Sequence, residues 1–108
     1  MSIEIHHSAL KAMKEFPSEV LREAKEAFAL LEAGEVLSMP LSRPMPSVWP
    51  RCFELRFSDR QGKYRIFYFI VVKGTIYVPH CFQKKSQKTP QTAIELVQRR
   101  IKEFLNEK

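Results

Sequence analysis

The stretch ELRFSDRQGKYRIFYFIVVKGTIYVPHCFQKKSQKTP, residues 54–90, decides the fold, because three strand-like runs in it lead to a cluster of lysines. The first run, FELRF at residues 53–57, alternates apolar and charged side chains. Side chains alternate between the faces of a strand, so Glu54 and Arg56 share one face and the apolar residues share the other. We expect a half-buried strand with an arginine on its open side.

The second run, Tyr64 to Val72, is apolar on both faces apart from Arg65, which is typical of a central strand. Lys73-Gly74 is a candidate two-residue turn into a third run, Thr75 to Phe82, which should pair antiparallel with the second. Pro79 in the third run has no N–H to donate. We therefore expect this strand to lie at a sheet edge or to carry a bulge there.

The chain leaves these strands through a lysine-rich segment, residues 83–88. Thr89 and Pro90 are typical of a helix N-cap followed by proline at the first helical position. We expect a final helix from Pro90 to about Asn106. Its apolar side chains recur at helical spacing and should point inward: Ile94, Val97, Ile101, Phe104 and Leu105.

The N-terminal third alternates briefly at residues 3–6, which could form a short first strand, and then becomes helical. One helix should begin at about Ser8 and break at Phe16-Pro17, and a second should run from Ser18 to a cap at Gly34. Residues 36–50 contain four of the seven prolines and should be irregular, with their apolar side chains docked on the domain. The pattern predicts an α+β fold: a small antiparallel sheet of three or four strands, two N-terminal helices and a C-terminal helix.

The 108 residues are enough for one domain, spanning 1–108, with a real core. Residues 1–35 contain 4 Lys/Arg against 7 Asp/Glu, whereas residues 36–108 contain 14 against 5. A basic half with aromatic side chains is typical of proteins that bind phosphates. The two cysteines and three histidines have no metal-ligand spacing, so we expect reduced cysteines, no metal site and no cofactor. We find no signal peptide and no membrane span, and expect a cytoplasmic protein.

The order of three motifs resembles the phage-derived HigB-like group of the RelE/ParE toxin superfamily. The motifs are ELR at residues 54–56, G-x-YRIFY at 62–68, and H-x-F-x-KK-x-x-KTP at 80–90, followed by Glu95, Arg99 and Arg100. The resemblance implies a small antiparallel sheet with helices against one face. It also implies a type II toxin that inhibits translation by cleaving mRNA on the ribosome. The implied partner is a helix-turn-helix antitoxin, which could form a hetero-oligomer with the toxin.

The residues permit that chemistry. RNA cleavage without a metal needs a base for the 2′-OH, cationic donors for the phosphate and an acid for the leaving oxygen. Mutual repulsion within a lysine cluster lowers the pKa of at least one lysine, and arginines are suited to clamping a phosphate. The candidate catalytic residues are Arg65, Lys84 and Lys85, and the candidate RNA-binding residues are Arg56, Tyr64, Tyr68 and Lys88.

Alternatives remain open for these residues and for the protein. The lysines can form a solvated loop, Arg56 and Arg65 can pair with Glu54 or Asp59, and the two tyrosines can be core aromatics. The same fold could act as a ParE-like inhibitor of DNA gyrase without catalysis. A third possibility is a non-catalytic nucleic-acid-binding domain that uses the N-terminal helices, although that segment carries a negative net charge.

Overall fold

The computed structural model describes residues 1–71, 74–85 and 87–107. The predicted Lys73-Gly74 turn and the last residue of the predicted second strand, Val72, therefore fall wholly or partly outside the described residues. The elements in chain order are β1 (Ser2–Ile5), α1 (His7–Met13), α2 (Ser18–Glu32), β2 (Ser42–Pro44), β3 (Cys52–Asp59), β4 (Gly62–Val71), β5 (Thr75–Lys84) and α3 (Gln91–Asn106).

The five strands form one sheet in the order β1-β5-β4-β3-β2. β4 is the middle strand, as its apolar residues on both faces predicted, and it pairs antiparallel with β3 and with β5. The predicted α+β class is confirmed. The sheet is not wholly antiparallel, because β1 pairs parallel with β5, with Ile5 opposite Val78. β2 was not predicted; it adds a three-residue strand within the proline-rich segment that was expected to be irregular.

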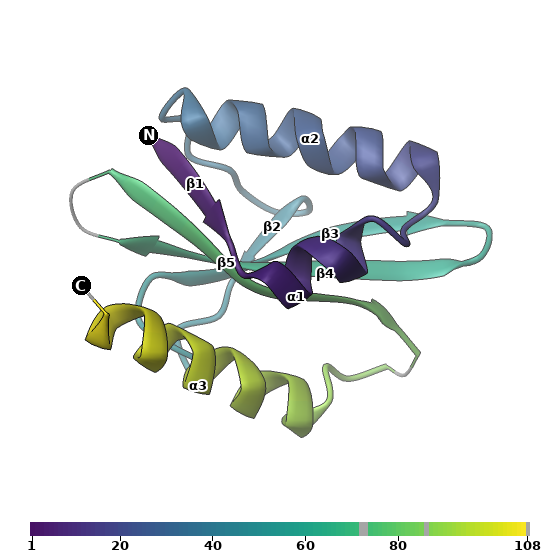
Figure 1. Ribbon diagram of the computed structural model, residues 1–108. Helices are drawn as coiled ribbons and strands as arrows, with labels where there is room; N and C mark the ends of the chain where they lie inside the picture. Colours follow the sequence, from purple (N-terminus) through teal and green to yellow (C-terminus); the bar gives the residue numbers. More distant parts are fainter. Residues whose placement is uncertain (72–73, 86, 108) are drawn as a thin grey trace.

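Helices cover both faces of the sheet, with α1 and α2 on one side and α3 on the other (Figure 1). The expectation that helices lie against one face only is therefore wrong. Alternate residues of β4 enter two separate cores. Tyr64, Ile66 and Tyr68 pack with α1 and α2, whereas Phe67 and Phe69 pack with α3. This arrangement explains why β4 is apolar on both faces.

Pro79 lies inside the sheet and is accommodated by an irregularity in strand pairing. β5 lies between β1 and β4, so the strand is not at an edge. The β4–β5 register shifts between Phe67 and Phe69, opposite the segment that contains Pro79, so the predicted bulge is confirmed. β1 also ends here, with the His6 N–H donating to the Val78 carbonyl at 3.0 Å. Neither neighbouring strand therefore needs a donor at Pro79.

The start of α3 differs from the prediction by one residue. Pro90 is the N-cap, and the helix begins at Gln91. The Thr89 hydroxyl does not cap the helix; it donates to the Glu54 carboxylate at 3.0 Å. The predicted inward stripe of α3 is correct for Val97, Ile101 and Phe104, which are buried, but Leu105 is 38% exposed.

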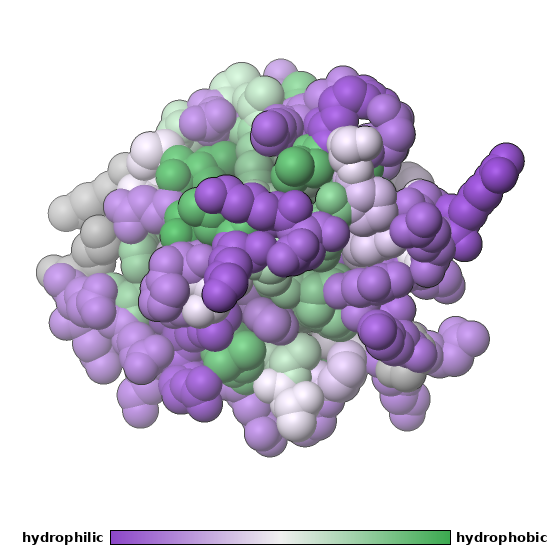
Figure 2. Space-filling model, turned by 45° about the vertical axis from the view of Figure 1, so that its right-hand side comes forward, coloured by the Kyte–Doolittle hydropathy of each residue, from purple (hydrophilic) through white to green (hydrophobic). Residues whose placement is uncertain are grey.

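Hydrophilic residues cover most of the face shown in Figure 2, and hydrophobic side chains reach the surface in patches between them. Large hydrophobic side chains that are exposed in the structure are Met1, Leu10, Leu30, Val36, Met39 and Leu105. Among the described residues, no helix has the length and apolar character needed to span a membrane.

Candidate functional site

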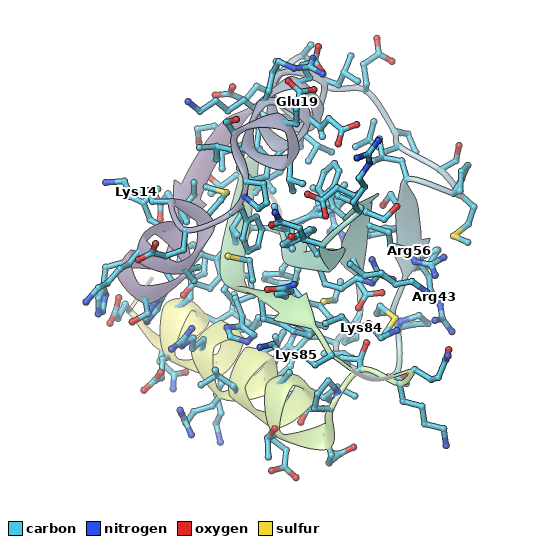
Figure 3. All side chains as sticks on the ribbon, turned by 90° about the vertical axis from the view of Figure 1, so that its right-hand side faces the viewer. Lys14, Glu19, Arg43, Arg56, Lys84 and Lys85 are labelled. Atoms are coloured by element: carbon cyan, nitrogen blue, oxygen red, sulfur yellow. The ribbon has the colours of Figure 1, made fainter. Side chains whose placement is uncertain are left out.

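Charged side chains gather on the α3 side of the sheet, beyond the N-terminal end of that helix. Strand register places Arg56 opposite Arg65, Lys63 opposite Lys84, and Arg43 opposite Glu54. Like charges directly opposite each other in a sheet are destabilising, and this sheet contains two such pairs side by side. We call Arg43, Arg56, Lys63, Arg65 and Lys84 the cation cluster. Figure 3 shows Arg43, Arg56 and Lys84 on the same side of the molecule, away from Lys14.

Arg65 is the buried centre of the cation cluster, with 3% of its surface exposed. Its Nε lies 3.7 Å from Glu54 Oε1, and its Nη1 donates to the carbonyls of Phe57 at 3.4 Å and Tyr64 at 3.1 Å. Burial lowers the pKa of Arg65, Glu54 opposes this change, and the neighbouring Arg56 adds to it. The guanidinium stays charged because its ordinary pKa is far above neutrality. Arg65 is therefore a fixed positive charge.

Glu54 was predicted to face solvent with Arg56, but it is only 1% exposed. Its Oε1 faces Arg65, and its Oε2 accepts the hydroxyl hydrogen bond from Thr89. Glu54 therefore ties β3 to β4 and to the segment that leads into α3. Sequence reasoning had treated Glu54 only as a possible ion-pair partner. The alternation signal gave its face correctly but did not show that this face is covered.

Lys84 is the last residue of β5 and is half-buried. Burial is the largest cause that lowers the pKa of Lys84, followed by the charge of Arg65, while Glu54 opposes the change. A lowered lysine pKa was predicted, but the expected cause was repulsion from Lys85 and Lys88. Those two side chains are exposed, and the charges that act on Lys84 come from β3 and β4.

Arg56 contributes a donor that has no hydrogen-bond partner within the described part of the chain. Its Nε is buried and unpaired, as is the Nε of Arg65 beyond its long contact with Glu54. Buried polar groups are usually satisfied, and an unsatisfied one often marks a binding or catalytic role. The unsatisfied Arg56 Nε therefore marks the cation cluster as a candidate anion site.

Tyr64 and Tyr68 lie on the opposite face of the sheet from the cation cluster. Tyr64 packs on Phe16, with the ring centres 5.0 Å apart. Tyr68 stacks on Phe53, and its hydroxyl forms a 2.7 Å hydrogen bond with Ser42 Oγ. Both tyrosines are buried, so the structure does not bring them together with the cations. They pack as core aromatics.

His80 lies on the same face as Lys84, four residues earlier in β5. Burial lowers the pKa of His80 to about 4, and the nearby Arg100 adds to the effect, so the imidazole is neutral at physiological pH. The ring stacks on Phe82 with centres 5.4 Å apart. Phe82 itself is opposite Arg65, so an aromatic side chain lies next to the cation cluster. Within the described residues, no three His, Cys, Asp or Glu side chains form a group that could hold a metal ion.

Comparisons with known proteins agree with the resemblance seen in the sequence. The model of the family described as "Phage derived protein Gp49-like" matches residues 11–102. A search of the curated proteins found no match. Among solved structures, the chain is similar to an arginine-to-alanine double mutant of the E. coli toxin RelE in the free state. The TM-score is 0.57 and the identity 18%, and the match covers 94% of each chain. The chain thus has the RelE fold and belongs to the phage-derived Gp49-like protein family.

Proposed function

We propose that this protein is the toxin of a type II toxin–antitoxin pair and a ribosome-dependent, metal-independent mRNA endoribonuclease that inhibits translation in the cytoplasm. The fold of a RelE toxin supports the toxin role and implies an antitoxin partner. One observation carries the catalytic role: Lys84 is half-buried beside the fixed charge of Arg65. Burial and, to a lesser extent, that charge lower the pKa of the Lys84 ammonium. A lysine that loses its proton more easily is a better base at neutral pH.

The residues of the site divide the cleavage chemistry as follows. Lys84 takes the proton of the 2′-OH, whose oxygen then attacks the phosphorus. Arg65 and Arg56 stabilise the negative charge that builds on the phosphate oxygens. Lys85 gives a proton to the 5′-oxygen as the P–O bond breaks, and Lys88 contacts the neighbouring backbone phosphates. Tyr64 and Tyr68 have no part in this assignment, because they are buried on the other face of the sheet.

Substitution of the lysines tests the assignment. Lys84→Ala and Lys85→Ala should each reduce cleavage of a translated message about 10²–10⁴-fold, the usual contribution of general acid–base catalysis. Lys84→Arg keeps the positive charge but cannot act as a base, so ribosome binding should persist while cleavage is lost. Lys14→Ala is the matched control, because Lys14 is exposed and lies away from the cluster (Figure 3). Full cleavage by an Arg65, Lys84 and Lys85 triple alanine variant would rule out the assignment.

A second candidate function is inhibition of DNA gyrase without catalysis, and one observation fits a non-catalytic protein. Arg65 is almost fully buried and paired with Glu54, which is also what a purely structural arginine would show. The same purified protein should be assayed for inhibition of gyrase supercoiling. Inhibition together with no cleavage of translated messages would favour the gyrase function over the ribonuclease.

A further inference from the structure

At the β2 edge of the sheet, the outward backbone groups are protected along β2 but exposed where β3 extends past it. β2 is the edge strand, and two backbone hydrogen bonds that flank it join the chain to β3: Arg56 N–H donates to the Leu41 carbonyl at 2.9 Å, and Met45 N–H donates to the Cys52 carbonyl at 2.8 Å. The outward N–H of Ser42 is already used by the Ser38 carbonyl at 3.0 Å. Pro44 has no N–H at all. Short strands and prolines of this kind protect a sheet edge from pairing with another chain.

β3 extends beyond β2, and there the edge has no such protection. In an antiparallel pair, residues alternate between pairs that exchange hydrogen bonds and pairs that do not. The Ile70 N–H donates to the Arg51 carbonyl, so odd-numbered residues of β3 bond to β4 and even-numbered ones face away. Ser58 therefore directs both its N–H and its carbonyl outward. No other described residue hydrogen-bonds to the backbone of Ser58.

A groove follows this open edge and has walls of different chemistry. Its volume is about 800 Å³. The wall from α2 contains Ala27 and Leu30, with Glu23 and Glu26 beside them. Leu30 is a large apolar side chain that is 46% exposed. The opposite wall contains three members of the cation cluster: Arg56, Lys63 and Arg65.

An occupant of this groove must satisfy both walls. A strand added beside Ser58 would place alternate side chains on the two faces of the sheet. Side chains on the α2 face would meet apolar atoms and two carboxylates, which favours apolar residues and disfavours acidic ones. Side chains on the other face would meet the cation cluster, which favours acidic residues.

We propose that β3 accepts a strand from the antitoxin at Ser58, with apolar side chains on the α2 face alternating with acidic side chains at the cation cluster. This strand would pair with β3 past the end of β2 and cover Arg56. One segment would then both dock on the toxin and mask the proposed site. The inference rests on the proposed function for the identity of the partner. The surface itself follows from the hydrogen bonding and the groove.

Short synthetic peptides test the surface without any assay of cleavage. The probe is a blocked ten-residue peptide of alternating valine and glutamate. One comparison peptide has lysine in place of glutamate, and another has the valines and glutamates in two blocks. Binding is measured by fluorescence anisotropy, and hydrogen exchange of the Ser58 amide is followed by NMR. The alternating acidic peptide should bind at least ~10-fold more tightly than either comparison peptide, and it should slow exchange of the Ser58 amide.

A pair of variants tests the backbone contact. Ser58→Pro removes the outward N–H but no bond to β4, and proline is tolerated at such edge positions. The expected result is at least ~10-fold weaker binding by Ser58→Pro, with Ser58→Ala unchanged. Equal binding by both variants would overturn the proposal, as would unchanged exchange of the Ser58 amide in the unaltered protein. The exchange measurement keeps the test decisive if Ser58→Pro fails to fold. A loss of cleavage in the lysine variants bears only on the proposed function, because peptide binding is measured independently.

Discussion

Glu54→Gln should be among the most damaging single substitutions in this chain, although it changes little in size. The glutamine keeps an acceptor for the Thr89 hydroxyl but removes the only negative charge that faces Arg65 among the contacts described above. Removal of one partner from a buried ion pair costs about 3–5 kcal/mol, because the other charge stays buried without compensation. Arg65 keeps its bonds to two backbone carbonyls, so we expect the lower end, about 3 kcal/mol.

Urea denaturation at pH 7 measures this loss, and thermal unfolding should show a midpoint about 12 °C lower. The control is Glu19→Gln. Glu19 also pairs with an arginine, Arg22, at 3.0 Å, but both side chains are more than half exposed. Exposed ion pairs contribute about 0–1 kcal/mol, so this control should barely change stability. If Glu54→Gln costs no more than Glu19→Gln, the buried pair does not hold the site together.

A double-mutant cycle shows whether the loss comes from Arg65 itself. When Arg65→Met is combined with Glu54→Gln, no uncompensated guanidinium remains at this position. The double variant should therefore lose about 2 kcal/mol less than the sum of the two single losses. Strict additivity would mean that Glu54 acts through Thr89 and the start of α3 instead.

Four further outcomes are expected. The folded protein holds His80 at a pKa of about 4 against an ordinary 6.5. Stability should therefore be full above pH 6.5 and fall by up to about 3 kcal/mol as pH drops toward 4; denaturation at both pH values should show this, and His80→Gln should remove it. Cleavage should rise with pH as Lys84 loses its proton, and Glu54→Gln should move that rise to lower pH, because the carboxylate holds the pKa of Lys84 up; an unmoved pH–rate profile would count against Lys84 as the base. Association with an acidic antitoxin should slow about 10-fold or more with added salt in stopped-flow measurements if the antitoxin docks on the cation cluster. Tyr68→Phe should cost about 1 kcal/mol of stability, because its hydroxyl bonds to Ser42, yet leave cleavage unchanged.

The sequence predicted those parts of the fold that depend on local pattern. Apolar residues on both faces identified β4 as the central strand, and apolar residues at helical spacing predicted α2 and α3. The spacing of apolar residues could not show which face of the sheet α3 covers, since an amphipathic helix can pack on either face. It also could not show that β1 pairs parallel with β5, because such a pairing depends on residues far apart in the chain.

The candidate site was also predicted only in part, because the sequence pattern gives the face of each strand residue but not what packs on that face. Alternation placed Arg56 and Glu54 on one face, and the lysine-rich segment at residues 83–88 was predicted to supply catalytic lysines. Burial depends on what covers a face, so neither the enclosed position of Glu54 nor the cause of the lowered Lys84 pKa followed from the pattern. Tyr64 and Tyr68 illustrate the converse, because their chemistry suited RNA binding while their face of the sheet lies under α1 and α2.

The parallel pairing of β1 with β5 has a consequence for the order of folding. Ser2 lies opposite Thr75, so this contact closes a loop of 73 residues, whereas the β3–β4–β5 hairpins close short ones. Long-range contacts form late, because the entropy of loop closure must be overcome before the contact stabilises the chain. On a growing chain, the N-terminal strand has no partner until Thr75–Val78 has been synthesised. β1 is thus expected to dock late, after the β3–β4–β5 hairpins have formed.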